Sequence, residues 1–491
     1  MIDEGQKRAP LAEAMKAYAK SGALAFHTPG HKQGLGAHEL LRELITPQGL
    51  REEVSLMSEL DDPAHPEGCI REAQALAEEL WGADHSFFMV NGTTGAIHTM
   101  LLASLAPGEE ILVPRNAHRS VAGGLVLSGA VPVYLPPAFS WRVGIAAGLP
   151  VRELETALEK HPGARGALVV SPNYYGMASD LAAMAELLHR RGKLLLVDEA
   201  HGAHLRFSAE LPPDAMACGA DMAAQSTHKL LGSLTQTSLL HLRTARLDYE
   251  RVRRTAALLA STSPDYLLLA SLDIARLQMA TEGRERTARA LALARWLRQE
   301  INRLDGLWCF GPEEIISAET GVTGFDELKL TVQVTGLGLT GPEAEQLLRY
   351  KYLLQCELVD RANVLFIISV SDTEETASRL LAALKGLCAG RAGAEPLPAQ
   401  RLLFAACPEQ VLTPREAFFA PRRTMRLDAA AGEISAEEIT FYPPGVPVIC
   451  PGERLTAELI ASVKEAAAAG LRVTGPADTS LETIAVIAQQ E

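Results

Sequence analysis

The sequence lacks the features that mark membrane and nucleic-acid-binding proteins. A membrane-spanning helix requires a run of about eighteen consecutive apolar residues, and no such run occurs in this chain. Basic residues are in the minority, with 46 Lys and Arg against 60 Asp and Glu, and the formal net charge of -14 would repel a phosphate backbone. No block of Lys and Arg offsets this charge. We therefore expect neither a membrane nor a nucleic-acid partner.

Cysteine is also sparse and irregularly placed. The chain has 7 cysteines, never arranged as Cys-x-x-Cys. Disulfide frameworks and cysteine metal sites show paired spacings, so we expect reduced thiols and no metal site. Residues 1–30 contain no apolar stretch of the kind found in secretory signals, which favours a cytoplasmic location.

Length and patterning predict several domains. The 491 residues exceed what one hydrophobic core usually organises. From about Glu72, helical and strand-like patterns alternate, which is typical of a mostly parallel sheet with helices on both faces. We expect an α/β fold divided into an N-terminal arm (1–45), a large domain (46–305), a small α/β domain (306–395) and a C-terminal domain (396–491).

A carboxylate is expected at the end of one buried strand. In the segment LLLVDEAHGAH, Asp198 follows four apolar residues. The carboxyl ends of such strands are where α/β sheets bind ligands. A buried carboxylate needs a partner, because an unpaired buried charge is unfavourable. Considered singly, Asp198 fits a salt bridge or a helix cap equally well.

A lysine at the end of a second apolar strand favours a ligand-binding role for Asp198 over a salt bridge or a helix cap. The segment DMAAQSTHK leads from that strand into Lys229. A lysine considered alone is usually a solvated surface residue. A lysine that forms a Schiff base must lie in a dry pocket, and the pyridine nitrogen of pyridoxal phosphate needs an anionic partner to stay protonated. Lys229 and Asp198 together provide both groups.

Two further strand-to-helix junctions provide weaker signals. The segment VNGTTGAIHTM, with Thr93 and Thr94, would present backbone N–H groups and hydroxyls to a phosphate, although Gly/Thr loops cap many helices. The segment VPRNAHRSV contains His118, which could lie flat on an aromatic cofactor. A lone histidine is more often a satisfied polar residue, so His118 depends on the other motifs.

Several longer segments occur in a fixed order: HTPGHKQG, GADHSFFMVNGTTGA, RNAHRSV, VDEAHGAH, QSTHK, STSPDYLLLASLD and YPPGVPVICPGE. In this order they resemble the bacterial ornithine/lysine/arginine decarboxylases, which have the aminotransferase fold (fold type I). The resemblance extends over nearly the full length. It is strongest to the short biosynthetic form of the Bacillus type, because no receiver-like domain precedes the HTPGHK segment.

The resemblance implies pyridoxal 5'-phosphate as cofactor and assigns the site. Lys229 would carry the cofactor, Asp198 would pair with its ring nitrogen and His118 would stack on the ring. Ala200 would pack beneath the ring, and His201 could meet the substrate. The implied phosphate ligands are Thr93, Thr94, Gly95, Ser226 and His228.

The family forms dimers with active sites at the subunit interface, so the resemblance implies a homodimer or larger homo-oligomer. Ser261 or Thr262, in the STSP segment, would then reach the phosphate in the neighbouring subunit. Two positions depart from the larger relatives. Gly95 replaces a Thr or Ser, and Pro66-Glu67-Gly68 replaces Pro-Thr-Gly, which leaves a phosphate contact and the local substrate loop in doubt.

The implied activity is that of a carboxy-lyase acting on a basic L-amino acid in polyamine biosynthesis. Arginine, giving agmatine and carbon dioxide, ranks before lysine and ornithine. A guanidinium group prefers a carboxylate fork, and Glu437 and Glu438 are candidates, although a solvated acidic pair fits equally. Lys229 or His228 would return the proton to Cα. The rivals are an aminotransferase or aldol-type lyase on this fold, and a noncatalytic regulatory relative.

Overall fold

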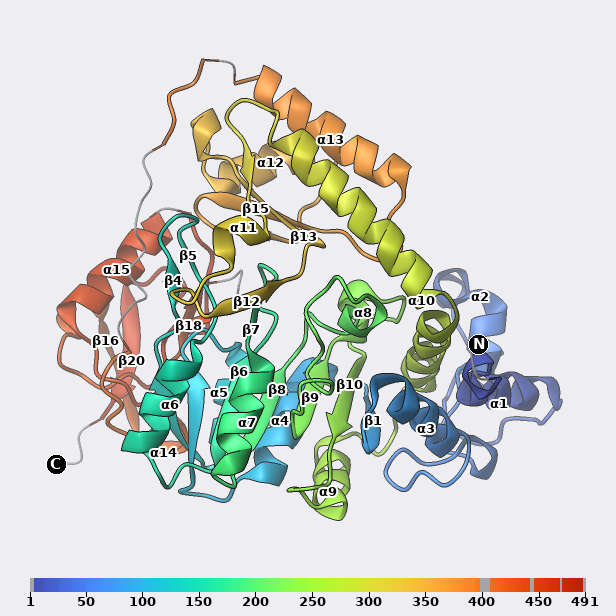
Figure 1. Ribbon diagram of the computed structural model, residues 1–491. Helices are drawn as coiled ribbons and strands as arrows, with labels where there is room; N and C mark the ends of the chain where they lie inside the picture. Colours follow the sequence, from blue (N-terminus) through green and yellow to red (C-terminus); the bar gives the residue numbers. More distant parts are fainter. Residues whose placement is uncertain (1–3, 392, 398–406, 442–445, 469, 489–491) are drawn as a thin grey trace.

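The computed structural model describes residues 4–391, 393–397, 407–441, 446–468 and 470–488. Its centre is a seven-stranded sheet (Figure 1), hereafter the central sheet. Strand β10 is antiparallel to both of its neighbours, and the other pairings are parallel. In spatial order the strands are β1 (His85–Met89), β10 (Ser238–Leu242), β9 (Met222–Gln225), β8 (Leu194–Asp198), β6 (Gly166–Val170), β2 (Glu110–Pro114) and β3 (Val131–Leu135).

Helices cover both faces of the central sheet, as the alternating pattern predicts. Leu194 and Leu196 of β8 pack into one core together with α4 (Gly92–Ser104), α5 (Arg119–Ser128) and α9 (Tyr249–Leu259). The intervening Leu195 and Val197 pack into a second core with α6 (Val151–Lys160) and α7 (Leu181–Arg190). Successive side chains of a strand point to opposite faces, so an unbroken apolar strand buries both.

A long helix leads to a second, smaller sheet (Figure 1). Helix α10 (Tyr266–Ile301) has 36 residues, and its last turns pack into the core of an antiparallel four-stranded sheet, hereafter the small sheet. The small sheet is β11 (Trp308–Cys309), β13 (Lys329–Gln333), β15 (Asn363–Ile367) and β14 (Leu358–Val359), which pack with α12 (Gly341–Tyr352) and α13 (Glu374–Ala389). Strand β12 (Val322–Phe325) pairs with β7 (Met177–Ser179) and joins the two regions. Helix α11 (Pro312–Ile315) lies between β11 and β12 in the chain.

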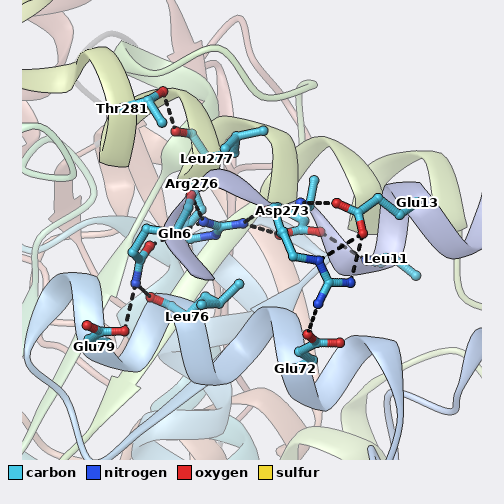
Figure 2. A network of polar contacts seen from close by, with 12 residues as sticks. Gln6, Leu11, Glu13, Glu72, Leu76, Glu79, Asp273, Arg276, Leu277 and Thr281 are labelled. Carbon is cyan, nitrogen blue, oxygen red and sulfur yellow. Dashed lines mark hydrogen bonds and ion pairs between the residues drawn. The ribbon is translucent and has the colours of Figure 1, made fainter. Parts of the chain in front are cut away.

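The N-terminal segment is anchored to its own chain by a buried polar network (Figure 2). Helix α1 (Pro10–Lys20) packs against α3 (Cys69–Trp81) and α10. The Arg276 guanidinium donates to the carbonyl of Gln6 (2.9 Å) and to Asp273 (2.8 Å), and Asp273 accepts the Leu11 N–H (3.0 Å). The chain then continues through His27–Gly34 to α2 (Glu39–Glu52).

The C-terminal module, residues 407–488 without the undescribed positions, has its own hydrophobic core. The Tyr-Pro-Pro-Gly part of the expected motif, 442–445, lies outside the described residues. The expected domain boundaries stay a prediction. The module contains α14 (Pro414–Phe419), β16 (Arg422–Arg426), β17 (Ile439–Phe441), β18 (Val446–Ile449), α15 (Ala457–Ala468), β19 (Val473–Thr474) and β20 (Thr483–Ile487). No helix within the described ranges is long and apolar enough to cross a membrane.

Candidate active site

A cavity of about 1270 Å³ lies at the carboxyl ends of the parallel strands. Val170 ends β6, Asp198 ends β8, and Ser226 follows β9; all three line the cavity. The small sheet contributes Gln333, and the C-terminal module contributes Val448. Ligands bind at this edge of open α/β sheets, so the topology places the cavity where a binding site is expected.

Lys229 lies in this cavity, on the short helix α8 (Thr227–Leu230) that follows β9. Its Nζ is 2.9 Å from Nε2 of His201 and 4.9 Å from the centre of the Tyr174 ring. Burial disfavours the ammonium form and lowers the pKa of Lys229 to about 8, although the negative charge of Asp198 opposes the shift. Near neutral pH, a larger fraction of Lys229 is therefore the neutral, nucleophilic amine than for an ordinary lysine.

Asp198 lines the same cavity and is only 3% exposed. One carboxylate oxygen accepts the N–H of Ala200 at 3.1 Å. Burial raises the pKa of Asp198, while the positive charge of Lys229 and the Ala200 hydrogen bond counteract the shift. A buried carboxylate of this kind is stabilised by a further cationic group in the cavity, such as a protonated ring nitrogen.

The first turn of α4 forms the expected phosphate cradle in part. Thr93 and Thr94 line the cavity, and the first N–H groups of a helix have no partner within it. The Thr93 hydroxyl is 2.5 Å from the Ser226 hydroxyl, which joins two of the expected ligands. Gly95 does not lie among the cavity-lining residues, since its N–H donates to the Asn91 carbonyl (3.0 Å) and a Cβ there would lie 3.0 Å from the Asn91 Cβ. The expected contact from Gly95 stays a prediction.

Two further expected histidines line the cavity. His118 caps α5, where its Nδ1 accepts the N–H of Ser120 at 3.2 Å. Burial lowers the pKa of His118 to about 4, so this imidazole is neutral at physiological pH. His228 donates from Nδ1 to the Thr237 carbonyl at 2.7 Å, and burial lowers its pKa as well. Both rings are held in fixed orientations by backbone groups.

The remaining expected residues divide into two groups. Ala200 and His201 line the cavity. Ser261 and Thr262 are exposed, between α9 and α10, and are not part of the lining formed by the described residues of one chain. Their expected role concerns a neighbouring subunit and stays a prediction.

The two candidate guanidinium ligands are not in the cavity lining of the described chain. The carboxylate oxygens of Glu437 accept backbone N–H groups of Ala477 (3.0 Å) and Ala485 (2.8 Å), so this carboxylate stabilises the C-terminal module. Glu438 accepts the Thr440 hydroxyl at 2.6 Å and lies 4.0 Å from Arg119. The expected role of Glu437 and Glu438 in binding a guanidinium group stays a prediction.

Comparison with known proteins agrees with this geometry. The model of the "Orn/Lys/Arg decarboxylase, major domain" matches residues 9–376, and that of the corresponding C-terminal domain matches residues 398–469. The chain belongs to the Orn/Lys/Arg decarboxylase family. It is therefore a decarboxylase of the ornithine, lysine and arginine class, and the family is typically dependent on pyridoxal phosphate.

Two curated relatives and one solved structure extend the comparison. The chain is 42% identical to an arginine decarboxylase of Halalkalibacterium halodurans and 41% identical to one of Bacillus subtilis, in each case over 99% of both chains. The crystal structure of the Francisella novicida lysine decarboxylase LdcF matches with a TM-score of 0.84 at 23% identity, over 99% of this chain and 82% of that chain. This match confirms the expected aminotransferase-type fold.

Sequence reasoning missed Tyr174 and the buried polar residues beside it. The centres of the Tyr174 and His201 rings lie 4.2 Å apart. Tyr174 lies shortly after the end of β6, in the same way that Asp198 lies at the end of β8. The adjacent Tyr175 donates its hydroxyl to Asp360 at 2.8 Å. The strand-end rule that selected Asp198 could therefore have selected the SPNYYG segment of this decarboxylase.

Proposed function

We propose that this protein decarboxylates L-arginine to agmatine and carbon dioxide, using pyridoxal 5'-phosphate bound at Lys229. The observation that carries the proposal is the convergence of Lys229 and Asp198 in one cavity, next to the N-terminus of α4. The full-length relatives named arginine decarboxylase support arginine over lysine and ornithine.

The cavity residues fit the cofactor by their chemistry. Lys229 would hold its aldehyde carbon, Asp198 would keep its ring nitrogen protonated, and the neutral ring of His118 would lie against its face. The N–H groups of α4, with the hydroxyls of Thr94 and Ser226, would hold the phosphate. When bound, pyridoxal phosphate supplies an electron sink for the bond that breaks at Cα.

The protein's own part is to orient the amino acid and exclude water. The α-carboxylate must leave perpendicular to the cofactor ring, which requires fixed contacts on the substrate. Of the described residues, Asp198 and Asp360 are the only carboxylates that line the cavity. Asp360 already accepts hydrogen bonds from Tyr175 (2.8 Å) and Asn363 (2.9 Å). A carboxylate for the guanidinium tail would then come from a neighbouring subunit.

The proposal therefore includes a homodimer with shared sites. Large apolar side chains are exposed along residues 21–57, and Phe26 is 93% exposed. Exposed apolar clusters mark interaction surfaces, and a second copy of this chain is the proposed occupant. A cytoplasmic location and a role in polyamine biosynthesis complete the proposal.

The identity of the substrate can be tested by supplying each amino acid separately. Purified protein with pyridoxal phosphate would receive L-arginine, L-lysine or L-ornithine, and carbon dioxide release would be compared with the amine formed. A carboxylate that pairs with the guanidinium tail should favour arginine over the shorter amines by about a hundredfold in kcat/KM. A preference for lysine or ornithine would overturn the ranking, and release of a keto acid without carbon dioxide would overturn the assigned reaction.

A further inference from the structure

The amine of Lys229 contacts side chains that follow two neighbouring strands of the central sheet. Strands β9, β8 and β6 lie side by side and run parallel, so their carboxyl ends meet at one edge. Lys229 follows β9, His201 lies in the turn after β8, and Tyr174 lies shortly after β6. All three residues line the cavity. The strand order therefore brings His201 and Tyr174 to Lys229 from the same side.

The loop that carries Tyr174 is held by its own hydrogen bonds. Asn173 Oδ1 accepts the N–H groups of Tyr175 and Met177, each at 3.0 Å. The Tyr174 ring is half-buried and packs against a hydrophobic cluster that includes Tyr175 and Met177. Its centre lies 4.2 Å from that of the His201 ring, and His201 is 3% exposed. Both rings are therefore held in place beside the lysine amine.

Both rings favour the charged form of Lys229. Its Nζ lies 2.9 Å from Nε2 of His201 and 4.9 Å from the centre of the Tyr174 ring. An ammonium group has donors and no acceptor, so a neutral His201 accepts its hydrogen bond through the Nε2 lone pair. The face of an aromatic ring attracts a cation within about 6 Å of the ring centre, and this attraction depends on the positive charge. His201 and Tyr174 thus form a binding site for the lysine ammonium, hereafter the ammonium site.

The proton stays on Lys229 in this arrangement. Burial and the positive charges of Lys229 and Lys329 hold the pKa of His201 well below its ordinary value. Burial lowers the pKa of Lys229 only to about 8, because the negative charge of Asp198 opposes the shift. Among the described residues, the other titratable groups that interact electrostatically with Lys229 are His118, His228, Lys329 and Glu357. The ammonium site therefore binds the charged lysine and does not take its proton.

We infer that His201 and Tyr174 hold the Lys229 ammonium while this lysine is not joined to the cofactor. The inference rests on the proposed function and deepens it. The incoming amino acid takes the place of Lys229 on the cofactor, so the lysine is free for part of each catalytic cycle. A free lysine side chain has many rotamers, and confining it costs conformational entropy. The two contacts offset this cost, which makes His201 and Tyr174 positioning residues for Lys229 and not contacts for the tail of the substrate.

The titration of Lys229 tests the ammonium site in full-length, cofactor-free protein. The midpoint of its reductive methylation would be measured by peptide mass spectrometry over a series of pH values. Tyr174→Leu removes the aromatic face, so the ammonium form loses stabilisation and the midpoint should fall by about 0.5 to 1 pH unit. Tyr174→Phe keeps the face and should leave the midpoint unchanged. Phe139→Leu is the control, because Phe139 lines the same cavity but its ring packs on Trp141.

Two variants of His201 provide an independent pair. His201→Leu removes the acceptor for the ammonium group, and the midpoint should fall by about 1 to 2 pH units. His201→Gln retains an acceptor oxygen and should keep most of the wild-type value. This pair decides the inference if Tyr174→Leu does not fold.

Turnover separates the ammonium site from a contact with the substrate. We expect Tyr174→Leu and His201→Leu to lower kcat by about fivefold or more with KM little changed, and the Phe and Gln variants to retain most of kcat. Equal midpoints within either pair of variants would overturn the inference, as would a rise in KM at unchanged kcat. Absence of decarboxylation by the wild-type protein would instead refute the proposed function, and the methylation midpoints would still decide whether His201 and Tyr174 bind the ammonium group.

Discussion

The guanidinium of Arg115 and the carboxylate of Glu453 form a bidentate pair between residues 338 positions apart in the chain. The pair is buried, with side chains 5% and 0% exposed. Arg115 also donates to the Val448 carbonyl at 2.7 Å, and Glu453 accepts the Cys450 N–H at 2.7 Å. Arg115 and Val448 both line the cavity. The pair therefore holds the C-terminal module against the active site.

Glu453→Gln should destabilise the protein strongly. The substitution leaves the Arg115 guanidinium buried without a counter-charge, which costs about 3–5 kcal/mol in comparable cases. Urea unfolding followed by fluorescence would measure the loss. Glu433→Gln is the control in the same module, because Glu433 pairs with the half-exposed Arg423 and exposed pairs contribute about 1 kcal/mol or less. Equal losses in the two variants would contradict the role of the buried pair.

Borohydride reduction of the cofactor-loaded protein should label Lys229. Peptide mapping should find the pyridoxyl group on that residue, and its appearance on another lysine would refute the site. In cofactor-free protein, reductive methylation of Lys229 should have a midpoint near pH 8, because burial lowers its pKa to about 8. Asp198→Asn should move the midpoint to lower pH, since the Asp198 charge stabilises the ammonium form.

Asp198→Ala should retain cofactor binding and lose most turnover. Without the carboxylate the ring nitrogen loses its proton, and a neutral pyridine is a poor electron sink. We expect kcat to fall by about a hundredfold or more, with the absorbance of bound cofactor still present. Asp214→Asn is a suitable comparison, because Asp214 is buried and pairs with Arg206 (3.1 Å) but does not line the cavity. Near-normal turnover in Asp198→Ala would refute the proposed role.

His241 should make the folded state sensitive to acid. It is fully buried, and burial lowers its pKa to about 3. Below its ordinary pKa near 6.5 the unfolded chain binds a proton that the folded chain does not, so stability falls as the pH drops from about 6.5 towards 3. At pH 5 the loss is about 2 kcal/mol. His241→Gln should therefore show a shallower decline in the free energy of unfolding, and identical pH profiles would contradict this explanation.

Local sequence patterns predicted the central residues of the site. They did not predict contacts between residues that lie far apart in the chain. Asp198 and Lys229 each follow an apolar strand, so the local sequence predicts both their place and their proximity. The pairing of Arg115 with Glu453 depends on how the C-terminal module packs, which no local pattern encodes. The partners of Glu437, Ala477 and Ala485, likewise lie far along the chain, so no local pattern indicates them.

The sharing of sites between two subunits can be tested by complementation. In the proposed dimer, each site combines Lys229 of one chain with Ser261 and Thr262 of the other chain. These two residues are exposed in their own chain and would contact the phosphate in the neighbouring site. A Lys229→Ala chain mixed with a Ser261→Ala/Thr262→Ala chain would restore one complete site in each heterodimer.

With random pairing of such subunits, about a quarter of wild-type activity should return. The control mixture combines Lys229→Ala with Asp198→Ala. These two residues line the same cavity of one chain, so every site in that heterodimer lacks one of them and activity should not return. Native mass spectrometry would verify that heterodimers form in both mixtures. If verified heterodimers of the first mixture are as inactive as those of the control, Ser261 and Thr262 do not serve the neighbouring site, and the carboxylate missing from the cavity must be sought elsewhere in the dimer.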